Sequence, residues 1–172
     1  PHITLPEYLM YGRVSVVTEV KSGNGVINSI VLKSDDGDEL DVEIVGSNAV
    51  SWQSNYFVKG DTTTYDRMVT IDAPTLENGL HNFTIEWLPN RVAWYYDGVE
   101  VRVLTPETSQ GLPTAPCRLS IGGWSVKPES SEWTIDWAKG LPDFSQGPYG
   151  LIVHAITVQD FSSGLEYEYA DS

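Results

Sequence analysis

Hydrophobic and polar residues alternate with a period of two along most of the chain, a pattern that predicts β-strands. In His81–Leu88, for example, Phe83, Ile85 and Trp87 fall on one face and polar residues on the other. Similar runs cover Tyr11–Glu19, Val26–Lys33, Glu39–Val45, Val50–Lys59, Met68–Asp72, Arg91–Tyr96, Glu100–Leu104, Cys117–Gly122 and Gly150–Phe161. No segment has the helical period over a useful length.

Turn signals separate these runs at short intervals. Asp97-Gly98 suits a two-residue type I′ hairpin, and Gly37 lies between two aspartates before the acidic run. The stretch Pro106–Pro116 contains three prolines and is typical of a long surface loop. Many short strands without helices predict an all-β fold, a β-sandwich of the jelly-roll type, as a single domain over residues 1–172.

The charge of the chain narrows the choice of partner. It has 24 acidic and 10 basic residues, and the resulting net charge of −14 opposes binding to nucleic acid or to anionic membranes. No apolar run approaches the ~20 residues that span a bilayer. The single cysteine, Cys117, excludes an intrachain disulfide and precedes an apolar run, so we expect a buried free thiol.

The most unusual segment is Glu39–Val45, which carries three acids in seven residues. On a strand, Glu39, Asp41 and Glu43 share one face, where mutual repulsion raises the pKa of at least one carboxyl. Glycoside cleavage uses such a set, with one ionised carboxylate as nucleophile and one protonated acid as proton donor. The Cα atoms of the two glutamates are about 13 Å apart on an extended strand, so their side chains would have to lean together. A solvated acidic strand in an acidic protein is the alternative that spacing alone leaves open.

The segment Asp38–Gly46 resembles the signature of glycoside hydrolase family sixteen, a concanavalin A-like jelly roll, in its regular-strand form. Flanking segments resemble the fungal Crh branch of chitin–glucan transglycosylases within that family. The similar segments, in order between about residues 8 and 170, are Tyr11–Val14, Gly25–Ser29, Gln53–Gly60, Thr64–Arg67, His81–Trp87, Trp94–Gly98 and Trp133–Ala138. The resemblance implies that Glu39 is the nucleophile, Asp41 its assisting residue and Glu43 the general acid/base of a double displacement.

Two departures from the family pattern modify this expectation. Family members carry a longer stretch before the point where this chain begins, with an N-terminal strand and, in the Crh branch, a cysteine pair. We therefore expect this chain to lack an N-terminal segment of the domain. Ser125–Ser130 replaces the usual glycine-rich loop, so contacts to an acceptor sugar are expected to differ.

The polar run after the acidic strand provides candidate sugar ligands. Gln53 and Asn55 would hydrogen-bond sugar hydroxyls, because alternate residues share a face. Arg67 would either contact sugar or neutralise the carboxylates. Trp124 and Trp137 lie near polar loops and are the expected stacking platforms, whereas Trp87 and Trp94 continue apolar strand faces. The expected substrate-binding residues are Gln53, Asn55, Tyr56, Lys59, Arg67, Trp124 and Trp137.

The remaining motifs give no evidence for a metal, a cofactor or a serine nucleophile. His81 begins a strand and is expected to be structural, and no histidine cluster predicts a metal site. Asp35, Asp36 and Asp38 lack the spacing of an EF-hand, and the chain has neither a phosphate loop nor a serine-nucleophile elbow. We therefore expect no cofactor and no metal in the site, and the sequence leaves a structural calcium in the jelly roll as an open alternative. Asn82-Phe83-Thr84 is a glycosylation sequon.

The resulting hypothesis is a retaining glycosidase or transglycosylase of cell-wall polysaccharide, acting on chitin and β-glucan. The expected protein is monomeric and secreted or wall-located, with surface anchoring possible in a longer chain. The alternative is a carbohydrate-binding module of the same fold, in which aromatic residues bind sugar without chemistry. A structural wall protein is a third possibility.

Overall fold

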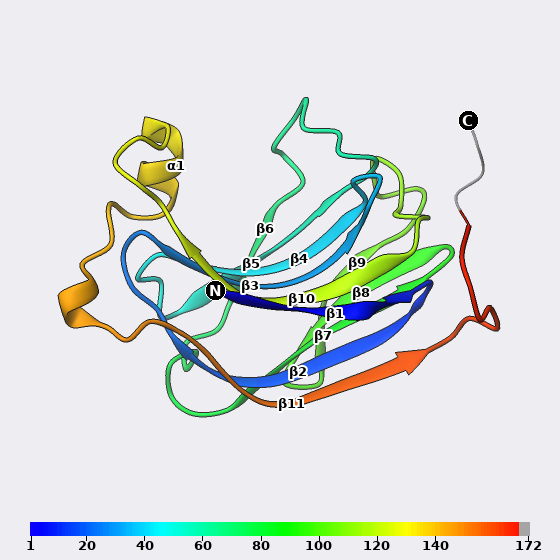
Figure 1. Ribbon diagram of the computed structural model, residues 1–172, viewed down its shortest axis with the longest axis horizontal. Coiled ribbons are helices and arrows are strands. Elements are labelled where there is room, and N and C mark those ends of the chain that lie inside the picture. Colours follow the sequence, from blue (N-terminus) through cyan, green and yellow to red (C-terminus); the bar gives the residue numbers. More distant parts are fainter. Residues whose placement is uncertain (169–172) are drawn as a thin grey trace.

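The computed structural model describes residues 1–168, which fold into two antiparallel sheets packed face to face (Figure 1). The six-stranded sheet has the order β1 (His2–Leu9), β10 (Cys117–Ser125), β3 (Val26–Ser34), β4 (Glu39–Val45), β5 (Ser51–Phe57) and β6 (Val69–Asp72). The five-stranded sheet has the order β11 (Gly150–Asp160), β2 (Gly12–Lys21), β7 (His81–Leu88), β8 (Arg91–Tyr96) and β9 (Val99–Leu104). This confirms the predicted β-sandwich. Residues 169–172 of the expected domain, and the last two residues of the family-like stretch, lie outside the described residues.

The apolar faces of both sheets form the core. Leu40, Val42 and Ile44 of β4 are fully buried between the sheets, which turns the alternate residues of β4 outward. Trp87 and Trp94 are also fully buried, as the alternation predicted. Burial of these apolar faces is the main force that fixes which side of each strand remains available for a ligand.

Turn chemistry follows the sequence closely at the β8–β9 hairpin. Asp97 and Gly98 have φ angles of 50° and 81°. Both values are positive, as a type I′ turn requires, and this confirms the predicted hairpin. Cys117 is the predicted buried free thiol, and burial raises its pKa.

Three elements were not predicted from the sequence pattern. Strand β1 lies at the sheet edge and is mostly exposed, and its register on β10 shifts between Thr4 and Tyr8, around Pro6, so its residues do not alternate cleanly. Helix α1 (Glu132–Trp137) has only six residues, too few to display a period. Its N-terminus is capped by the Ser131 side chain, which accepts a hydrogen bond from the Thr134 amide. A short 3-10 helix, η1, covers Phe144–Gln146.

The turn that leads into β4 is anchored by Asp38, which is fully buried. Its carboxylate accepts hydrogen bonds from three backbone amides, at 2.7 Å from Lys59, 2.7 Å from Thr114 and 2.9 Å from Ala115. This side chain therefore joins three separate segments at the start of the acidic strand. Within residues 1–168, no group of three or more His, Cys, Asp or Glu side chains is arranged to hold a metal ion.

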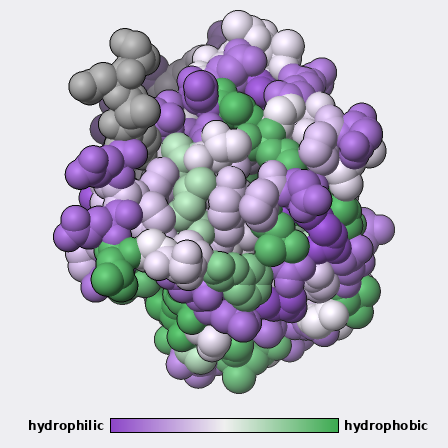
Figure 2. Space-filling view, turned by 90° about the vertical axis from the view of Figure 1, so that its right-hand side faces the viewer, coloured by the Kyte–Doolittle hydropathy of each residue, from purple (hydrophilic) through white to green (hydrophobic). Residues whose placement is uncertain are grey.

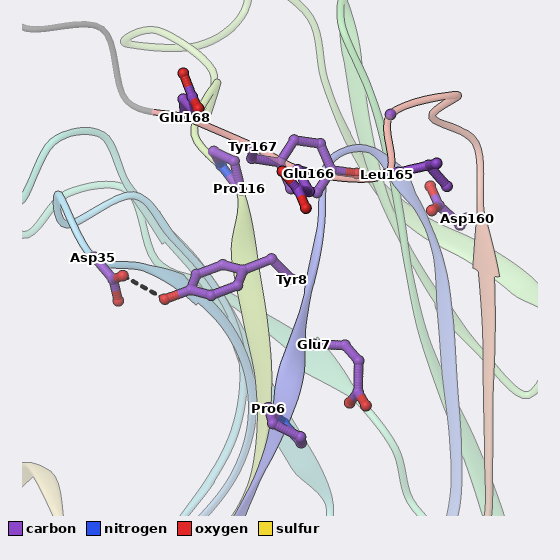
Figure 3. Close-up of a pocket in the computed structure, with 11 residues that line it drawn as sticks. Pro6, Glu7, Tyr8, Asp35, Pro116, Asp160, Leu165, Glu166, Tyr167 and Glu168 are labelled. Carbon is purple, nitrogen blue, oxygen red and sulfur yellow. Dashed lines mark hydrogen bonds between the residues drawn. The ribbon is translucent and has the colours of Figure 1, made fainter.

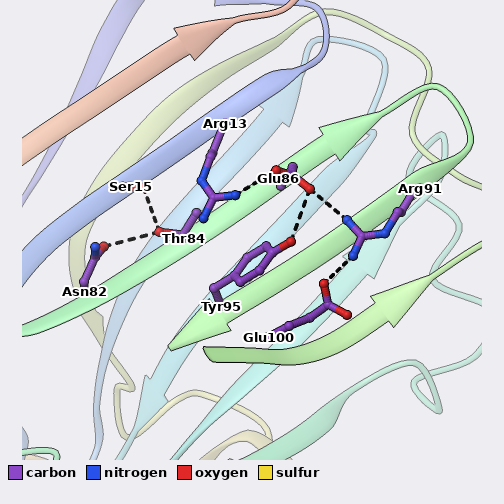
Figure 4. A network of polar contacts seen from close by, with 8 residues as sticks. All are labelled: Arg13, Ser15, Asn82, Thr84, Glu86, Arg91, Tyr95 and Glu100. Atoms are coloured by element: carbon purple, nitrogen blue, oxygen red, sulfur yellow. Dashed lines mark hydrogen bonds and ion pairs between the residues drawn. The ribbon is translucent and has the colours of Figure 1, made fainter. Parts of the chain in front are cut away.

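The outer face of the five-stranded sheet carries a network of polar contacts (Figure 4). Glu86 accepts from Arg13 at 2.7 Å and from Arg91 at 2.8 Å, and Arg91 also pairs with Glu100. Asn82 lies on this sheet beside Thr84, whose hydroxyl is 3.3 Å from the Asn82 side-chain oxygen. The sequon thus lies on the sheet opposite β4.

His81 contacts only groups that hold it in place. One ring nitrogen lies 2.8 Å from Asp97 and the other 2.8 Å from the Thr75 carbonyl, and the ring stacks on Tyr96. This confirms a structural role.

The surface of the molecule is largely hydrophilic at one end of the sandwich (Figure 2). Figure 2 shows one end of the sandwich, where hydrophilic side chains predominate and apolar patches are scattered between them. In the described part of the chain, no helix combines the length and apolar character needed to cross a membrane.

Candidate active site

The three acids of β4 lie on the outer face of the six-stranded sheet, as the sequence predicted. Figure 1 shows this sheet bowed, with α1 rising above one end of it. Asp41 is the central acid and only 2% exposed, whereas Glu39 and Glu43 are half-buried on either side of it. The fully buried Trp94 donates its indole N–H to the Asp41 carbonyl at 2.9 Å, which ties the middle of β4 to the core behind it.

Neighbouring strands give each acid a different pair of neighbours. Glu39 lies between Lys33 of β3 and Phe57 of β5. Asp41 lies between Val31 and Asn55, and Glu43 between Ser29 and Gln53. These cross-strand positions share one face, because residues directly opposite in an antiparallel pair point the same way.

Gln53 and Asn55 are therefore placed beside the acids, as predicted. The Trp137 indole N–H donates to the Gln53 side-chain oxygen at 3.0 Å, so the orientation of this amide is fixed by α1. The same contact brings α1 to the edge of the acidic face.

The electrostatic environments of the acids are unequal. Burial raises the pKa of Asp41 well above its usual range, and the charges of Glu39 and Glu43 raise it further. Burial, with a contribution from Glu39, raises the pKa of Glu43 to about 7. One Asp41 carboxyl oxygen is buried and has no protein donor, which fits a protonated carboxyl that interacts with Glu39.

Glu39 differs because it has a cation beside it. Its carboxylate is hydrogen bonded and ion-paired with the Lys33 ammonium. Among residues 1–168, this is the one ion pair that involves an acid of β4. Glu39 is therefore the acid of this face with a cationic partner, whereas the raised pKa values of Asp41 and Glu43 favour the neutral forms of those two carboxyls.

A continuous series of aromatic rings borders the acids. Trp124 contacts Trp137 at 6.0 Å between ring centroids, and Trp133 stacks on Trp137 at 6.1 Å with an interplanar angle of 5°. Tyr65 then contacts Trp133 at 5.8 Å and Phe57 at 6.4 Å. This aromatic series, defined as Trp124, Trp137, Trp133, Tyr65 and Phe57, runs from β10 across α1 and the β5–β6 loop to the neighbour of Glu39.

Three expected ligands lie elsewhere. The Tyr56 side chain is only 2% exposed in the core, and its hydroxyl accepts from the Gln110 amide, so the prediction that it faces the sugar is wrong. It follows Asn55 directly and therefore points to the opposite face of β5. Lys59 lies beyond the end of β5 in a turn with a φ of 50°.

Arg67 is buried and does not pair with the acids of β4. Its guanidinium donates to the carbonyls of Asp61 and Thr64, at 2.6 and 3.0 Å, and lies over the Phe57 ring. Neither expected role is supported, because Arg67 holds the β5–β6 loop in shape.

Three residues of the aromatic series were missed by the sequence analysis. The period-two rule that selected Gln53 and Asn55 also selects Phe57, so that signal was available. Trp133 and Trp137 share a face because they are four residues apart on α1, a helix too short to predict. Tyr65 lies in a loop, and no local pattern places it.

A separate hollow of about 840 Å³ lies between β1 and residues 164–168, away from the acids of β4 (Figure 3). Its lining includes Tyr8, whose hydroxyl donates to Asp35, together with Glu7, Asp160 and Glu166. We place the candidate site on β4, because there the acids, a cation and the aromatic series converge.

Comparison with known proteins agrees with this geometry. The family model Glycosyl hydrolases family 16 matches residues 2–139. The chain belongs to this family. The Crh-like protein CRH11 of Candida albicans is 40% identical over 165 residues, which is 95% of this chain and 36% of that protein. This glycosyl hydrolase family 16 chain thus spans about a third of the length of that relative.

Solved structures of the family are similar in fold. A Crh5 transglycosylase in complex with NAG matches with a TM-score of 0.90 and 40% identity, over 94% of this chain and 69% of that one. A Bacillus licheniformis beta-glucanase matches with a TM-score of 0.75 and 18% identity, over 94% of this chain and 71% of the glucanase. The jelly-roll fold and the resemblance to the Crh branch are both confirmed.

Proposed function

We propose that this chain is a retaining glycosidase or transglycosylase of cell-wall polysaccharide. The observation that carries the proposal is the outer face of β4, where three carboxyl groups have three different environments. Glu39 is paired with a cation, Asp41 is buried, and the pKa of Glu43 is raised to about 7. Two acids in opposite protonation states are what a retaining mechanism requires at its start.

In the first step, the Glu39 carboxylate attacks the anomeric carbon and forms an ester with the sugar. Glu43, whose pKa is raised to about 7, holds its proton below that pH and donates it to the departing glycosidic oxygen. Asp41, kept neutral by burial, donates a hydrogen bond to Glu39 and orients it. This step leaves a glycosyl-enzyme and a Glu43 carboxylate.

In the second step, Glu43 takes a proton from water or from an acceptor hydroxyl. The deprotonated oxygen attacks the anomeric carbon, and the electron pair of the ester bond returns to Glu39. Water gives hydrolysis and a sugar acceptor gives transfer. Both outcomes share the covalent intermediate, so the same residues serve either activity.

The aromatic series supports a polysaccharide as substrate. Trp133 and Trp124 are 62% and 44% exposed, so both rings offer surface to a ligand, although Trp137 stacks on one face of Trp133. Flat apolar rings pack against the C–H faces of sugars, while Gln53 and Asn55 offer hydrogen bonds to hydroxyls. A similar Crh5 transglycosylase holds NAG, which favours chitin as donor. The acceptor we propose is a β-glucan.

We further propose a single monomeric domain over residues 1–172, in a protein that is secreted or located in the cell wall. A neutral polysaccharide is compatible with the net charge of −14, which disfavours nucleic acid as a partner.

Product analysis tests the proposal. The protein is incubated with labelled chitin oligosaccharide and a β-glucan acceptor, and the products are identified by mass. Hybrids of donor and acceptor support a transglycosylase, and shortened chitin oligosaccharides support a hydrolase. Glu39→Gln should abolish both products, whereas Glu100→Gln, at an exposed position on β9 of the opposite sheet, should not. Oligosaccharide binding without any product would instead support the carbohydrate-binding module.

A further inference from the structure

Lys33 is the cation beside the three acids, and the mechanism above does not use it. It lies directly opposite Glu39 in the β3–β4 pairing, and its ammonium is bonded to one carboxylate oxygen of Glu39. The Lys33 side chain is 58% exposed and that of Glu39 is 21% exposed. Lys33 therefore contacts the nucleophile from the neighbouring strand without being part of the core.

The surroundings of Lys33 direct it toward Glu39. Its partner on the other side, in β10, is Arg118. Arg118 lies over the Tyr8 ring and pairs with Asp35 at 2.9 Å. Because Arg118 carries the same charge as Lys33 and already has its own acid, repulsion favours the Lys33 side chain leaning toward β4.

Among residues 1–168, Lys33 is the one cation that is paired with Glu39 across a strand or ion-paired with it. Asp41 and Glu43 follow it on β4, and Phe57 faces it from β5. The interaction with Lys33 is thus the one that offsets the negative charge of Glu39 on this face.

We propose that Lys33 shortens the lifetime of the glycosyl-enzyme by favouring the form of the protein in which Glu39 is a free carboxylate. This inference rests on the proposed function. In the glycosyl-enzyme, Glu39 is a neutral ester, so the Lys33 ammonium no longer has a carboxylate to pair with. When the acceptor oxygen bonds to the anomeric carbon and passes its proton to Glu43, the ester bond breaks and the ion pair forms again. Lys33 is therefore a positioning residue for release, because it stabilises the leaving carboxylate.

The test is the fraction of protein that carries sugar during steady turnover. The protein is mixed with chitohexaose at a mildly acidic pH, quenched in acid, and its intact mass measured. Lys33→Met should raise the glycosylated fraction, relative to free protein, by up to about fivefold, the range expected for a part-exposed ion pair. Lys33→Arg keeps the charge and should match the wild type, as should Lys21→Met on the opposite sheet.

The outcomes separate this inference from the function beneath it. A role of Lys33 in folding alone would lower turnover without raising the glycosylated fraction, so an unchanged or smaller fraction in Lys33→Met overturns the inference while the function stands. Equal thermal unfolding temperatures for Lys33→Met and Lys21→Met would show that both variants are folded. If the wild type never carries sugar, or Glu39→Gln does, the proposed function fails and this inference with it.

Discussion

At the scale of single residues, the ionisation of Glu43 should control the pH range of activity. The pKa of Glu43 is raised to about 7, mainly by burial. The protonated form is the one that can donate to the leaving oxygen, so kcat/KM should fall as the pH rises through about 7. A pH profile with chitin oligosaccharide measures this, and Glu43→Gln should lack both the activity and the alkaline limb.

The same shift affects stability. Folded Glu43 holds its proton up to about pH 7, whereas its unperturbed value is 4.5, so the folded state binds more protons between these values. The free energy of unfolding should therefore decrease as the pH rises across this window. Glu43→Gln removes the titration, and its stability at pH 7 should exceed that of the wild type by about 1 kcal/mol or more. Urea unfolding at several pH values tests this, and a wild type that gains stability across the window would contradict it.

Replacing Asp41 is expected to maintain or raise stability while lowering activity. Its carboxyl is buried beside two other acids, which raises its pKa. Asp41→Asn keeps the size and shape of the side chain and cannot ionise in its buried position. The variant should therefore be at least as stable as the wild type at neutral pH. It also loses the carboxyl proton shared with Glu39, and we expect kcat to fall about 10-fold or more. Unchanged kcat would contradict the assisting role.

At the scale of elements, helix α1 adds the exposed Trp133 to the aromatic series that borders the acids of β4. Trp133→Ala should weaken substrate binding and raise KM about 10-fold, since a stacked ring contributes roughly 1–2 kcal/mol. The effect on kcat should be small, because the Trp133 ring contacts the rings of Trp137 and Tyr65 rather than an acid of β4. Phe161→Ala, an exposed aromatic at the end of β11, is the matched control. Steady-state kinetics with chitin oligosaccharides measures this, and equal KM values for Trp133→Ala and Phe161→Ala would contradict the account.

The turn before β4 should contribute strongly to the stability of the protein, because it holds Asp38. The buried Asp38 carboxylate accepts hydrogen bonds from the amides of Lys59, Thr114 and Ala115, in two other segments. Each of these hydrogen bonds stabilises the folded protein. Asp38→Asn should lower the free energy of unfolding by roughly 2–3 kcal/mol. Asp72→Asn, in an exposed position on β6, should change it little. Denaturant unfolding of both variants gives the comparison.

The observed strands and helix also show which elements the alternation of hydrophobic and polar residues could predict. Alternation predicted most strands, because each has one face in the core, and it placed Glu39, Asp41 and Glu43 together on the other face. It failed for β1, an edge strand with little burial, and for α1, which is shorter than two helical turns. The choice of Tyr56 as a ligand went against the same alternation, which correctly placed its neighbours Gln53 and Asn55.

At the scale of the whole molecule, the site depends on contacts between segments far apart in the chain. The aromatic series joins β10, α1, the β5–β6 loop and β5, and the cation beside Glu39 comes from β3. No local pattern predicts that Tyr65 meets Trp133, because both lie in segments whose positions depend on the packed sheets. The acids, with Gln53 and Asn55 beside them, could therefore be predicted from the sequence, whereas the contacts of Tyr65, Trp133 and Lys33 could not.

The central claim is that Glu39 forms a covalent bond with sugar. The most direct measurement is to quench the protein during turnover of chitin oligosaccharide, digest it, and locate the attached sugar by tandem mass spectrometry. The account predicts a sugar mass on Glu39 in the wild type and none at any position in Glu39→Gln. A sugar located on Glu43 or on another residue, or turnover with no attached sugar at any time, would contradict it.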